Sequence, residues 1–272
     1  MYKLIAFDMD GTLLNTKKQL SQGNLEAIKR AFAQGKEVIL NTGRCLVELD
    51  EFLEMIPELR YVNCVSGALV YDVKEKKEIY AQKLSIDTIK KLFEIAAMEG
   101  AQPQLLNAES IVSTDFWEHM EDYNMEVYKP MFTRVATKWD NQYETYMANP
   151  FPAAKFNIYH TSKESRERTE QRIMEAGLDL ELVHAEISNL EISVKGVDKG
   201  IGLKKLCEYL HISCKETIAV GDAANDLGAM KTAGLAIAMA NARTAVKNVA
   251  DAIVADCDHD GCAEAIDRYL CE

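Results

Sequence analysis

The stretch that most constrains the fold lies at the start of the chain. Four apolar residues at positions 4–7 are followed by two carboxylates, Asp8 and Asp10, and then by Gly11 and Thr12. A short apolar run that ends at polar turn residues is typical of a buried parallel strand. The carboxyl end of such a strand is where an open α/β sheet presents its ligand-binding groups. We therefore expect Asp8 and Asp10 at the mouth of a buried strand.

Two acids at that place are unfavourable unless a cation meets them. Mg²⁺ is the natural candidate, because it takes oxygen ligands and keeps waters that a phosphate can replace. A carboxylate there can also act as a nucleophile and become an aspartyl-phosphate. The alternative is a polar strand end that caps the next helix, and an Asp-x-Asp pair alone does not separate the two interpretations.

Two later apolar runs repeat this pattern. Residues 38–40 lead into Thr42 and Gly43, and residues 217–220 lead into a turn that contains Asp222. Helices are expected over 21–34, from the Gly43 turn to about 55, and from 199 to about 210. A further helix is expected after the turn that contains Asp222, ending at about 232. Alternation of strands and helices predicts a parallel sheet. Because the carboxyl ends of parallel strands share one edge, the three turns are expected to converge.

The pattern of predicted elements changes near residue 85. A helical pattern over 86–99 precedes strand-like runs near 103–113, an aromatic and polar segment, a strand over 155–160, a charged helix over 162–176 and two strands within 178–194. We interpret 84–189 as an inserted α/β domain, and 1–83 plus 190–272 as the core. Lys155, Asn157 and His160 are candidates to face the active site, although such alternation also marks a half-buried strand.

Composition narrows the classes of function. The net charge of −12 over 272 residues argues against nonspecific nucleic-acid binding, but a local cluster with a metal can still bind an anionic small molecule. No apolar run approaches the ~18–20 residues that span a bilayer, and the N-terminus does not resemble a signal peptide. The seven cysteines form no Cys-x-x-Cys pair, which favours free thiols in a reducing cytoplasm. We expect a cytoplasmic protein, a monomer or small homo-oligomer.

Four motifs then occur in a fixed order: Asp8-Met9-Asp10-Gly11-Thr12, Thr42-Gly43-Arg44, Lys199-Gly200 and Gly221-Asp222 with Asn225-Asp226. Together they resemble the motifs of the haloacid dehalogenase-like (HAD) superfamily, and their order and inserted domain are most similar to its Cof-type, sugar-phosphatase-like branch. The resemblance covers essentially the whole chain, although the insertion matches only in position and size. It implies an α/β fold with a HAD-type, Rossmann-like parallel-sheet core and an inserted α/β cap domain that selects the substrate.

The resemblance also implies a role for each motif residue. Asp8 is the expected nucleophile, and Asp10 the general acid and base, which must start protonated. Mg²⁺ is expected on the Asp8 carboxylate, the Asp10 main-chain carbonyl and Asp222. The remaining motif residues are expected to bind phosphate (Met9, Thr42, Gly43, Lys199 and Asn225) or to support the site from behind (Asp226). The helix after Gly43 is expected to add positive potential.

Alone, most of these residues have ordinary explanations. Thr42 and Gly43 suit any strand–helix turn, Lys199 suits a helix start, and Arg44 can contact substrate or form a surface salt bridge. Two departures from the branch are Ser66 in place of an asparagine, and an acidic turn over 255–262. That turn has the acidic spacing of an EF-hand loop, but its last position is not Glu and a strand-like run precedes it, so we interpret it as a polar turn.

The function implied is a Mg²⁺-dependent phosphatase (a phosphoric monoester hydrolase) that hydrolyses small phosphorylated metabolites through an aspartyl-phosphate. Sugar phosphates are the leading substrates, with nucleotides, flavin mononucleotide and pyridoxal phosphate open. A phosphotransferase or phosphomutase with the same nucleophile is the first alternative, because it differs only in the acceptor. A non-catalytic phosphometabolite-binding protein is the second, and the intact Asp8 and Asp10 pair argues against it.

Overall fold

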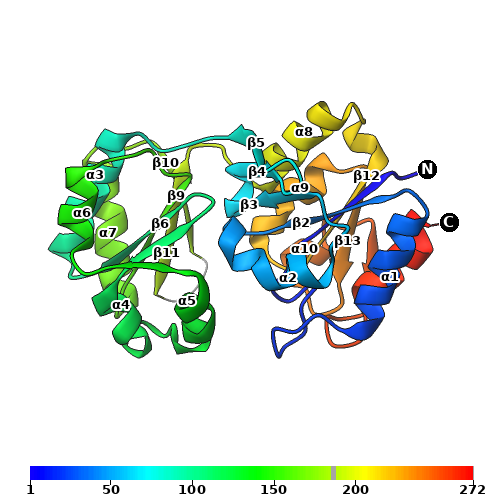
Figure 1. Cartoon of the computed structure of the whole chain (residues 1–272), viewed down its shortest axis with the longest axis horizontal. Helices are drawn as coiled ribbons and strands as arrows, with labels where there is room; N and C mark the ends of the chain where they lie inside the picture. The colour runs from blue at the N-terminus through cyan, green and yellow to red at the C-terminus, as the bar shows by residue number, and fades with distance from the viewer. Residues whose placement is uncertain (185–187, 272) are drawn as a thin grey trace. The chain divides into compact units, whose positions relative to one another are not determined.

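The computed structural model describes residues 1–184 and 188–271, and the chain divides into two compact units (Figure 1). Unit 1 comprises residues 1–44, 50–81 and 198–272, and unit 2 comprises residues 45–49 and 82–197. The last change of unit along the chain lies after Val197, eight residues beyond the expected residue 189, because β11 (Asn189–Val194) pairs with β9 (Lys155–Tyr159) and β10 (Leu180–His184). These strands therefore form one sheet in unit 2.

Unit 1 is built on an eight-stranded sheet with the order β14-β13-β12-β1-β2-β3-β4-β5. Its strands are β1 (Leu4–Phe7), β2 (Glu37–Asn41), β3 (Tyr61–Cys64), β4 (Leu69–Asp72), β5 (Lys77–Ala81), β12 (Thr217–Gly221), β13 (Leu235–Met239) and β14 (Ala252–Val254). The pairs from β14 to β3 are parallel, and β3, β4 and β5 pair antiparallel. The expected α/β fold with a parallel-sheet core is confirmed.

Strand β1 is flanked on both sides and fully buried. Leu4 pairs in register with Thr217 of β12 and with Glu37 of β2, and every side chain of β1 is inaccessible to solvent. The continuous apolar run of this strand follows from that burial on both faces. The turns after β1, β2 and β12 consequently lie next to one another at one edge of the sheet.

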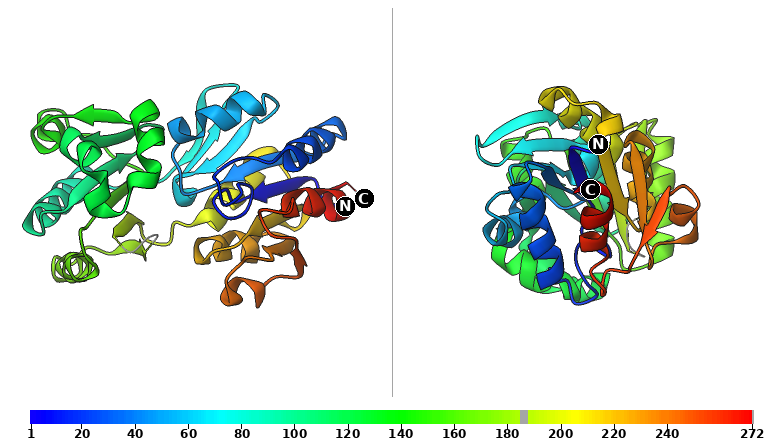
Figure 2. Two further views of the ribbon diagram at one scale, coloured as in Figure 1. Left: turned by 90° about the horizontal axis from the view of Figure 1, so that it is seen from below. Right: turned by 90° about the vertical axis from the view of Figure 1, so that its right-hand side faces the viewer.

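Helices of unit 1 cover both faces of its sheet (Figure 2). Because the β1–β2 and β12–β13 connections run in opposite directions along the sheet, right-handed crossovers place their helices on opposite faces. Accordingly, α1 packs on β2 and beside α11, whereas α8 packs on β3, β4 and β5 and beside α9. The helices are α1 (Gln22–Ala33), α2 (Asp50–Met55), α8 (Lys199–Leu210), α9 (Leu227–Thr232), α10 (Thr244–Lys247) and α11 (Gly261–Ala265).

Side-chain caps explain where two of these helices begin. Ser21 accepts the backbone N–H of Asn24 at the start of α1, and Asp198 accepts that of Ile201 at the start of α8. One expected helix is wrong in its extent. The segment after Gly43 forms a 3₁₀ turn, Leu46–Leu49, before α2 begins at Asp50.

Unit 2 contains a six-stranded sheet with the order β10-β11-β9-β6-β7-β8. Its further strands are β6 (Gln102–Leu106), β7 (Ser110–Ser113) and β8 (Thr137–Trp139), and its helices are α3 (Ile86–Met98), α4 (Thr114–Glu118), α5 (Lys129–Val135), α6 (Gln142–Ala148) and α7 (Lys163–Glu175). The aromatic segment between β7 and β9 forms α4, α5, α6 and β8, elements that the sequence pattern did not predict.

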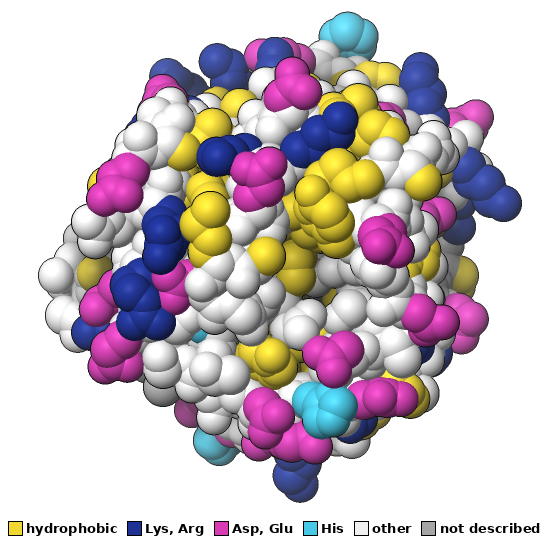
Figure 3. Space-filling view, turned by 90° about the vertical axis from the view of Figure 1, so that its left-hand side faces the viewer, with side chains coloured by type: hydrophobic (Ala, Val, Ile, Leu, Met, Phe, Trp, Pro, Cys, Tyr) yellow, Lys and Arg dark blue, Asp and Glu magenta, His cyan; other side chains and the backbone are white. Residues whose placement is uncertain are grey.

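Two features of the structure can be compared with what the composition predicts about membrane insertion and nucleic-acid binding. No helix within the described residues is long and apolar enough to cross a bilayer. On the face that Figure 3 draws, acidic side chains separate the basic ones, which therefore form no continuous patch there. That face lacks the basic surface that nonspecific nucleic-acid binding requires. All seven cysteines are free thiols.

Candidate active site

The turns after β1 and β12 place a buried lysine between two carboxylates. The Lys199 ammonium lies 2.5 Å from Asp8 Oδ1 and 2.7 Å from Asp226 Oδ1. All three residues are at most 6% exposed. Burial acts to lower the pKa of Lys199, but Asp226 and Asp8 outweigh burial and raise it. The lysine therefore carries a positive charge at neutral pH, aimed at the carboxylate expected to be the nucleophile.

Asp226 organises this part of the site. While its Oδ1 accepts from Lys199, its Oδ2 accepts the backbone N–H groups of Asp222 and Ala223, each at 3.0 Å. These bonds fix the turn after β12, and with it the Asp222 side chain. The role of Asp226 as a residue that supports the site stays a prediction.

Three carboxylates are close enough to hold a cation together. Asp8, Asp222 and Asp226 each offer an oxygen, and these oxygens lie within 4.8 Å of one another. Burial and the charge of Asp226 raise the pKa of Asp8 to about 8, against the effect of Lys199, and they raise the pKa of Asp222 as well. The cluster therefore has surplus negative charge, and an all-oxygen donor set of this kind fits Mg²⁺.

Asp222 is oriented by the first turn. Thr12 Oγ1 donates to Asp222 Oδ1 at 3.0 Å. The neighbouring Gly11 has φ of +88°, and a Cβ at that position would lie 2.7 Å from Asp222 Oδ2. Only glycine fits this conformation and this close approach, which explains the Asp-Gly-Thr sequence after β1.

Asp10 has different surroundings from Asp8. Its carboxylate accepts from Arg44 Nε at 3.0 Å and Nη2 at 2.8 Å, and from Lys18 Nζ at 2.8 Å. Burial acts to raise the pKa of Asp10, but the two cations outweigh it and lower the pKa. The expectation that its neighbours keep Asp10 protonated is therefore wrong for this arrangement, because they favour the charged carboxylate.

The same contacts decide between the alternatives for Arg44. Its side chain is only 12% exposed and pairs with Asp10, so it is neither a surface salt bridge nor a residue left for substrate alone. Lys18, which the sequence analysis did not select, is the second cation on Asp10. It lies in the loop after β1, and its spacing from the motif carries no distinctive signal.

The residues expected to bind phosphate differ in how far they are buried. Thr42 follows β2 and is 2% exposed, and its hydroxyl accepts the N–H of Arg44 at 3.2 Å. Met9 is fully buried between the two motif aspartates. Asn225 is exposed in the 3₁₀ turn Ala224–Asp226. No α-helix begins at Gly43, and the next one starts with two acidic residues, so the expected helix-terminal potential is not provided there.

A further residue supports Lys199 from the adjacent strand. The Asn63 side chain, fully buried on β3, donates to Asn41 Oδ1 at 2.6 Å and to the carbonyl oxygen of Lys199 at 2.8 Å. It thereby ties the first turn of α8 to the sheet. Sequence reasoning missed this role, because an asparagine within a strand has no local pattern.

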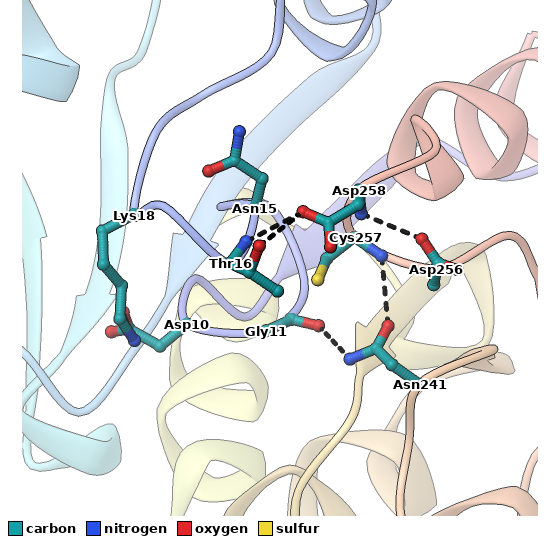
Figure 4. Close-up of a pocket in the computed structure, with 9 residues that line it drawn as sticks. All are labelled: Asp10, Gly11, Asn15, Thr16, Lys18, Asn241, Asp256, Cys257 and Asp258. Atoms are coloured by element: carbon teal, nitrogen blue, oxygen red, sulfur yellow. Dashed lines mark hydrogen bonds and ion pairs between the residues drawn. The ribbon is translucent and has the colours of Figure 1, made fainter.

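A cavity of about 390 Å³ lies beside Asp10 and is lined by the loop after β1 and by the acidic turn near the C-terminus (Figure 4). Asp258 Oδ1 accepts from the N–H and the hydroxyl of Thr16, both at 3.0 Å, and Asp260 accepts from Ser21 at 2.5 Å. Asp256 pairs with His259 at 2.6 Å. Asp258 and Asp260 thus connect this turn to the loop after β1 and to the start of α1, whereas Asp256 pairs within the turn itself, and these contacts agree with a polar turn.

Comparison with known proteins identifies the family. The sequence profile of the haloacid dehalogenase-like hydrolases matches residues 5–266, which is nearly the whole chain. The chain belongs to this hydrolase family. The four motifs were therefore interpreted correctly as a HAD pattern.

Several relatives of this hydrolase are named phosphatases. It is 30% identical to phosphatase YwpJ of Bacillus subtilis, over 98% of this chain and 100% of that protein. It is 26% identical to pyridoxal phosphate phosphatase YbhA of Escherichia coli, over 98% of each. A haloacid dehalogenase-like hydrolase from Bacteroides thetaiotaomicron has the same fold, with a TM-score of 0.87, 27% identity, and coverage of 98% of this chain and 99% of that one. These findings place the chain among the phosphoric monoester hydrolases.

Proposed function

We propose that this hydrolase is a Mg²⁺-dependent phosphatase of small phosphorylated metabolites, with sugar phosphates as the leading class, and that Asp8 forms an aspartyl-phosphate. The observation that carries the proposal is the buried Lys199 ammonium held between Asp8 and Asp226, beside Asp222. A cationic centre next to a buried carboxylate suits the attack of that carboxylate on an anionic phosphoryl group. The free cysteines agree with a cytoplasmic location.

The first chemical step is assigned to Asp8. Its carboxylate oxygen bonds to phosphorus while the ester P–O bond breaks, and the leaving oxygen takes a proton from Asp10. Lys199 neutralises phosphoryl charge, and the Thr42 hydroxyl, Gly43 and the Met9 backbone bind its oxygens. When bound to Asp8, the Asp10 carbonyl and Asp222, Mg²⁺ would offset repulsion between the nucleophile and the substrate.

Hydrolysis of the aspartyl-phosphate completes the reaction. A water attacks phosphorus, its proton passes to the Asp10 carboxylate, and Asp8 is released together with inorganic phosphate. To donate a proton in the first step, Asp10 must exchange its pairing with Arg44 and Lys18 for a contact with the substrate. We assign Asn225 to the phosphate and Asp226 to the support of Lys199, and we assign selection of the leaving group to unit 2.

The test is a phosphate-release assay with a panel of sugar phosphates, pyridoxal phosphate, flavin mononucleotide and nucleotides. It compares wild type, Asp8→Asn and the matched control Asp179→Asn, whose side chain is 83% exposed, with and without Mg²⁺. We expect Mg²⁺-dependent release that Asp8→Asn abolishes and Asp179→Asn retains. Release that survives Asp8→Asn would refute the nucleophile. Transfer of phosphate to an acceptor without release would instead identify a phosphotransferase.

A further inference from the structure

The loop between β3 and β4 has a left-handed backbone. Val65, Ser66 and Gly67 have φ values of +52°, +57° and +92° in succession. Residues with a side chain seldom adopt this conformation, because Cβ then crowds the following carbonyl oxygen, and β-branched residues adopt it least of all. Five other non-glycine residues with positive φ occur among the described residues, and all five are exposed. Val65 is fully buried, so here the strain lies in the interior of unit 1.

Closure of the hairpin does not by itself require this backbone. Cys64 pairs with Leu69, so residues 65–68 form the loop. Hairpin loops of four residues are most often built around a type I turn, whose two central residues have negative φ. Strained residues persist only where the surrounding structure holds them, and they cluster where the strain has a function. The partners of this loop indicate what that function is.

The loop fastens the turn that follows β2. The Val65 N–H donates to the Arg44 carbonyl oxygen at 2.9 Å, and the Ser66 N–H donates to the Thr42 carbonyl oxygen at 3.0 Å. Successive N–H groups of an extended strand point to opposite sides, whereas a left-handed turn directs them to one side. The positive φ values therefore allow both groups to reach the same neighbouring turn. Thr42 also donates its own N–H to the Asn63 carbonyl oxygen at 2.8 Å.

The same loop contacts the start of α8. A Cβ on Gly67 would lie 1.9 Å from the Asp198 carbonyl oxygen and 2.9 Å from the Lys199 backbone nitrogen, so backbone meets backbone there. The turn after β2 carries Arg44, whose Nη2 lies 2.8 Å from Asp10 Oδ1. All of these segments belong to unit 1. The loop thus joins two segments that carry groups of the candidate active site.

We infer that Val65 and Ser66 are positioning residues of the active site. Their left-handed backbone holds Thr42 in place for phosphate and Arg44 in place beside Asp10. The inference rests on the proposed phosphatase function. If the loop relaxed to negative φ, its two N–H groups would turn away from the turn after β2, and that turn would lose its fixed position. Catalysis depends on such fixed positions, because a misplaced group must be reordered before each reaction.

The experiment changes the cost of the left-handed conformation at Ser66. Glycine removes that cost and valine raises it, while both substitutions keep the backbone N–H and remove the same hydroxyl. The matched control is Lys76→Val, because Lys76 also has positive φ, +50°, but is exposed in the turn between β4 and β5. The assay measures Tm, kcat and KM of the full chain, at a temperature at which every variant is folded. Its substrate is the ester of the panel above that wild type hydrolyses fastest.

We expect Ser66→Val to lose about tenfold in kcat and Ser66→Gly to retain most of the wild-type value. Lys76→Val is expected to lose Tm, because it carries the same backbone strain, but to keep the wild-type kcat and KM. A residue that only stabilised the fold would lower Tm in Ser66→Val and leave kcat of the folded enzyme unchanged. Equal kcat in Ser66→Val and Ser66→Gly therefore overturns the inference, as does an equal loss of kcat in Lys76→Val.

Two further measurements keep the inference separate from folding and from the proposed function. If Ser66→Val does not fold, Ser66→Ala replaces it, and a kcat equal to that of Ser66→Gly overturns the inference. If wild type releases no phosphate from any ester, the proposed function has failed. Calorimetric binding of inorganic phosphate in the presence of Mg²⁺ then decides. Weaker binding to Ser66→Val than to Ser66→Gly supports the inference, and equal or absent binding overturns it.

Discussion

Replacing Asp8 and Asp10 by asparagine is expected to change stability in opposite directions in metal-free protein. Asp8 shares one ammonium with Asp226, and burial and that second carboxylate raise its pKa to about 8. Asp10 is held by Arg44 and Lys18, which lower its pKa. In Asp8→Asn the new amide oxygen can still accept from Lys199 without bringing a charge, so this substitution relieves repulsion. Asp10→Asn removes an attraction.

The size of the effect follows from linkage. The pKa of Asp8 rises from 3.8 to about 8 on folding. At 1.36 kcal/mol for each pKa unit, the ionisation of Asp8 at pH 7 therefore lowers the free energy of unfolding by up to about 4 kcal/mol. Each kcal/mol shifts the Tm by roughly 2–4 °C for a domain of this size, so Asp8→Asn raises the Tm by up to about 8–16 °C. Asp10 is 32% exposed, so solvent screening limits the loss in Asp10→Asn to about 1 kcal/mol.

The pH dependence gives a second signature. Because the folded-state pKa of Asp8 is raised, wild type loses stability as pH rises from about 4 to about 8, and the advantage of Asp8→Asn grows over that window. The folded-state pKa of Asp10 is lowered, so its contribution is already complete above pH 4 and Asp10→Asn shows no trend from pH 5 to 8.

Thermal unfolding with a chelator at pH 5, 6, 7 and 8 measures both signatures. A Tm of Asp8→Asn at or below that of wild type at pH 7, or a difference that does not grow with pH, would refute the reasoning. Either result would mean that the Asp8–Lys199 ion pair, and not repulsion among the three carboxylates, dominates the site.

Three other predictions test the metal site and unit 1. Adding Mg²⁺ to chelated protein raises the wild-type Tm, and Asp222→Asn reduces that rise while Asp179→Asn does not; equal rises in a fluorimetric melt would contradict Asp222 as a metal ligand. Asp72→Asn destabilises by about 1–3 kcal/mol in urea at neutral pH, because this buried carboxylate accepts from Arg60 and two backbone N–H groups. Because the pKa of Asp72 is lowered in the folded state, the difference in unfolding free energy between wild type and Asp72→Asn vanishes as pH falls below about 4. A difference that persists at such pH would contradict this prediction. Gly67→Ala destabilises by at least about 2 kcal/mol, because its Cβ would lie 1.9 Å from the Asp198 carbonyl oxygen; Gly35→Ala, with positive φ but open space, is the control and loses less.

Local patterns predicted the strands well where burial is continuous. The apolar runs at 4–7 and 217–220 became β1 (Leu4–Phe7) and β12 (Thr217–Gly221), because turn residues bound a short run that is buried in a parallel sheet. The helices between β7 and β9 were not predicted, since all three are short and their buried aromatic side chains pack only in tertiary contacts: those of α4 and α5 share one small core, whereas Tyr146 of α6 packs in the larger core of unit 2. Propensity is weak in helices of that length.

By itself, the sequence determined that the polar turns after β1 and β12 lie at one edge of a parallel sheet. The turns that carry Asp8 and Asp222 were expected together, because parallel strands bring their carboxyl ends to one edge, and the structure brings them together there. Lys199 was expected beside them only from the resemblance to the family. Only the tertiary structure decided which charges meet. Lys199 reaches Asp8 across 191 positions of sequence, and Arg44 reaches Asp10 across 34. The pKa of a buried carboxylate depends on neighbours that no local pattern names, and for that reason the expectation that Asp10 starts protonated did not anticipate Arg44 and Lys18, which lower its pKa.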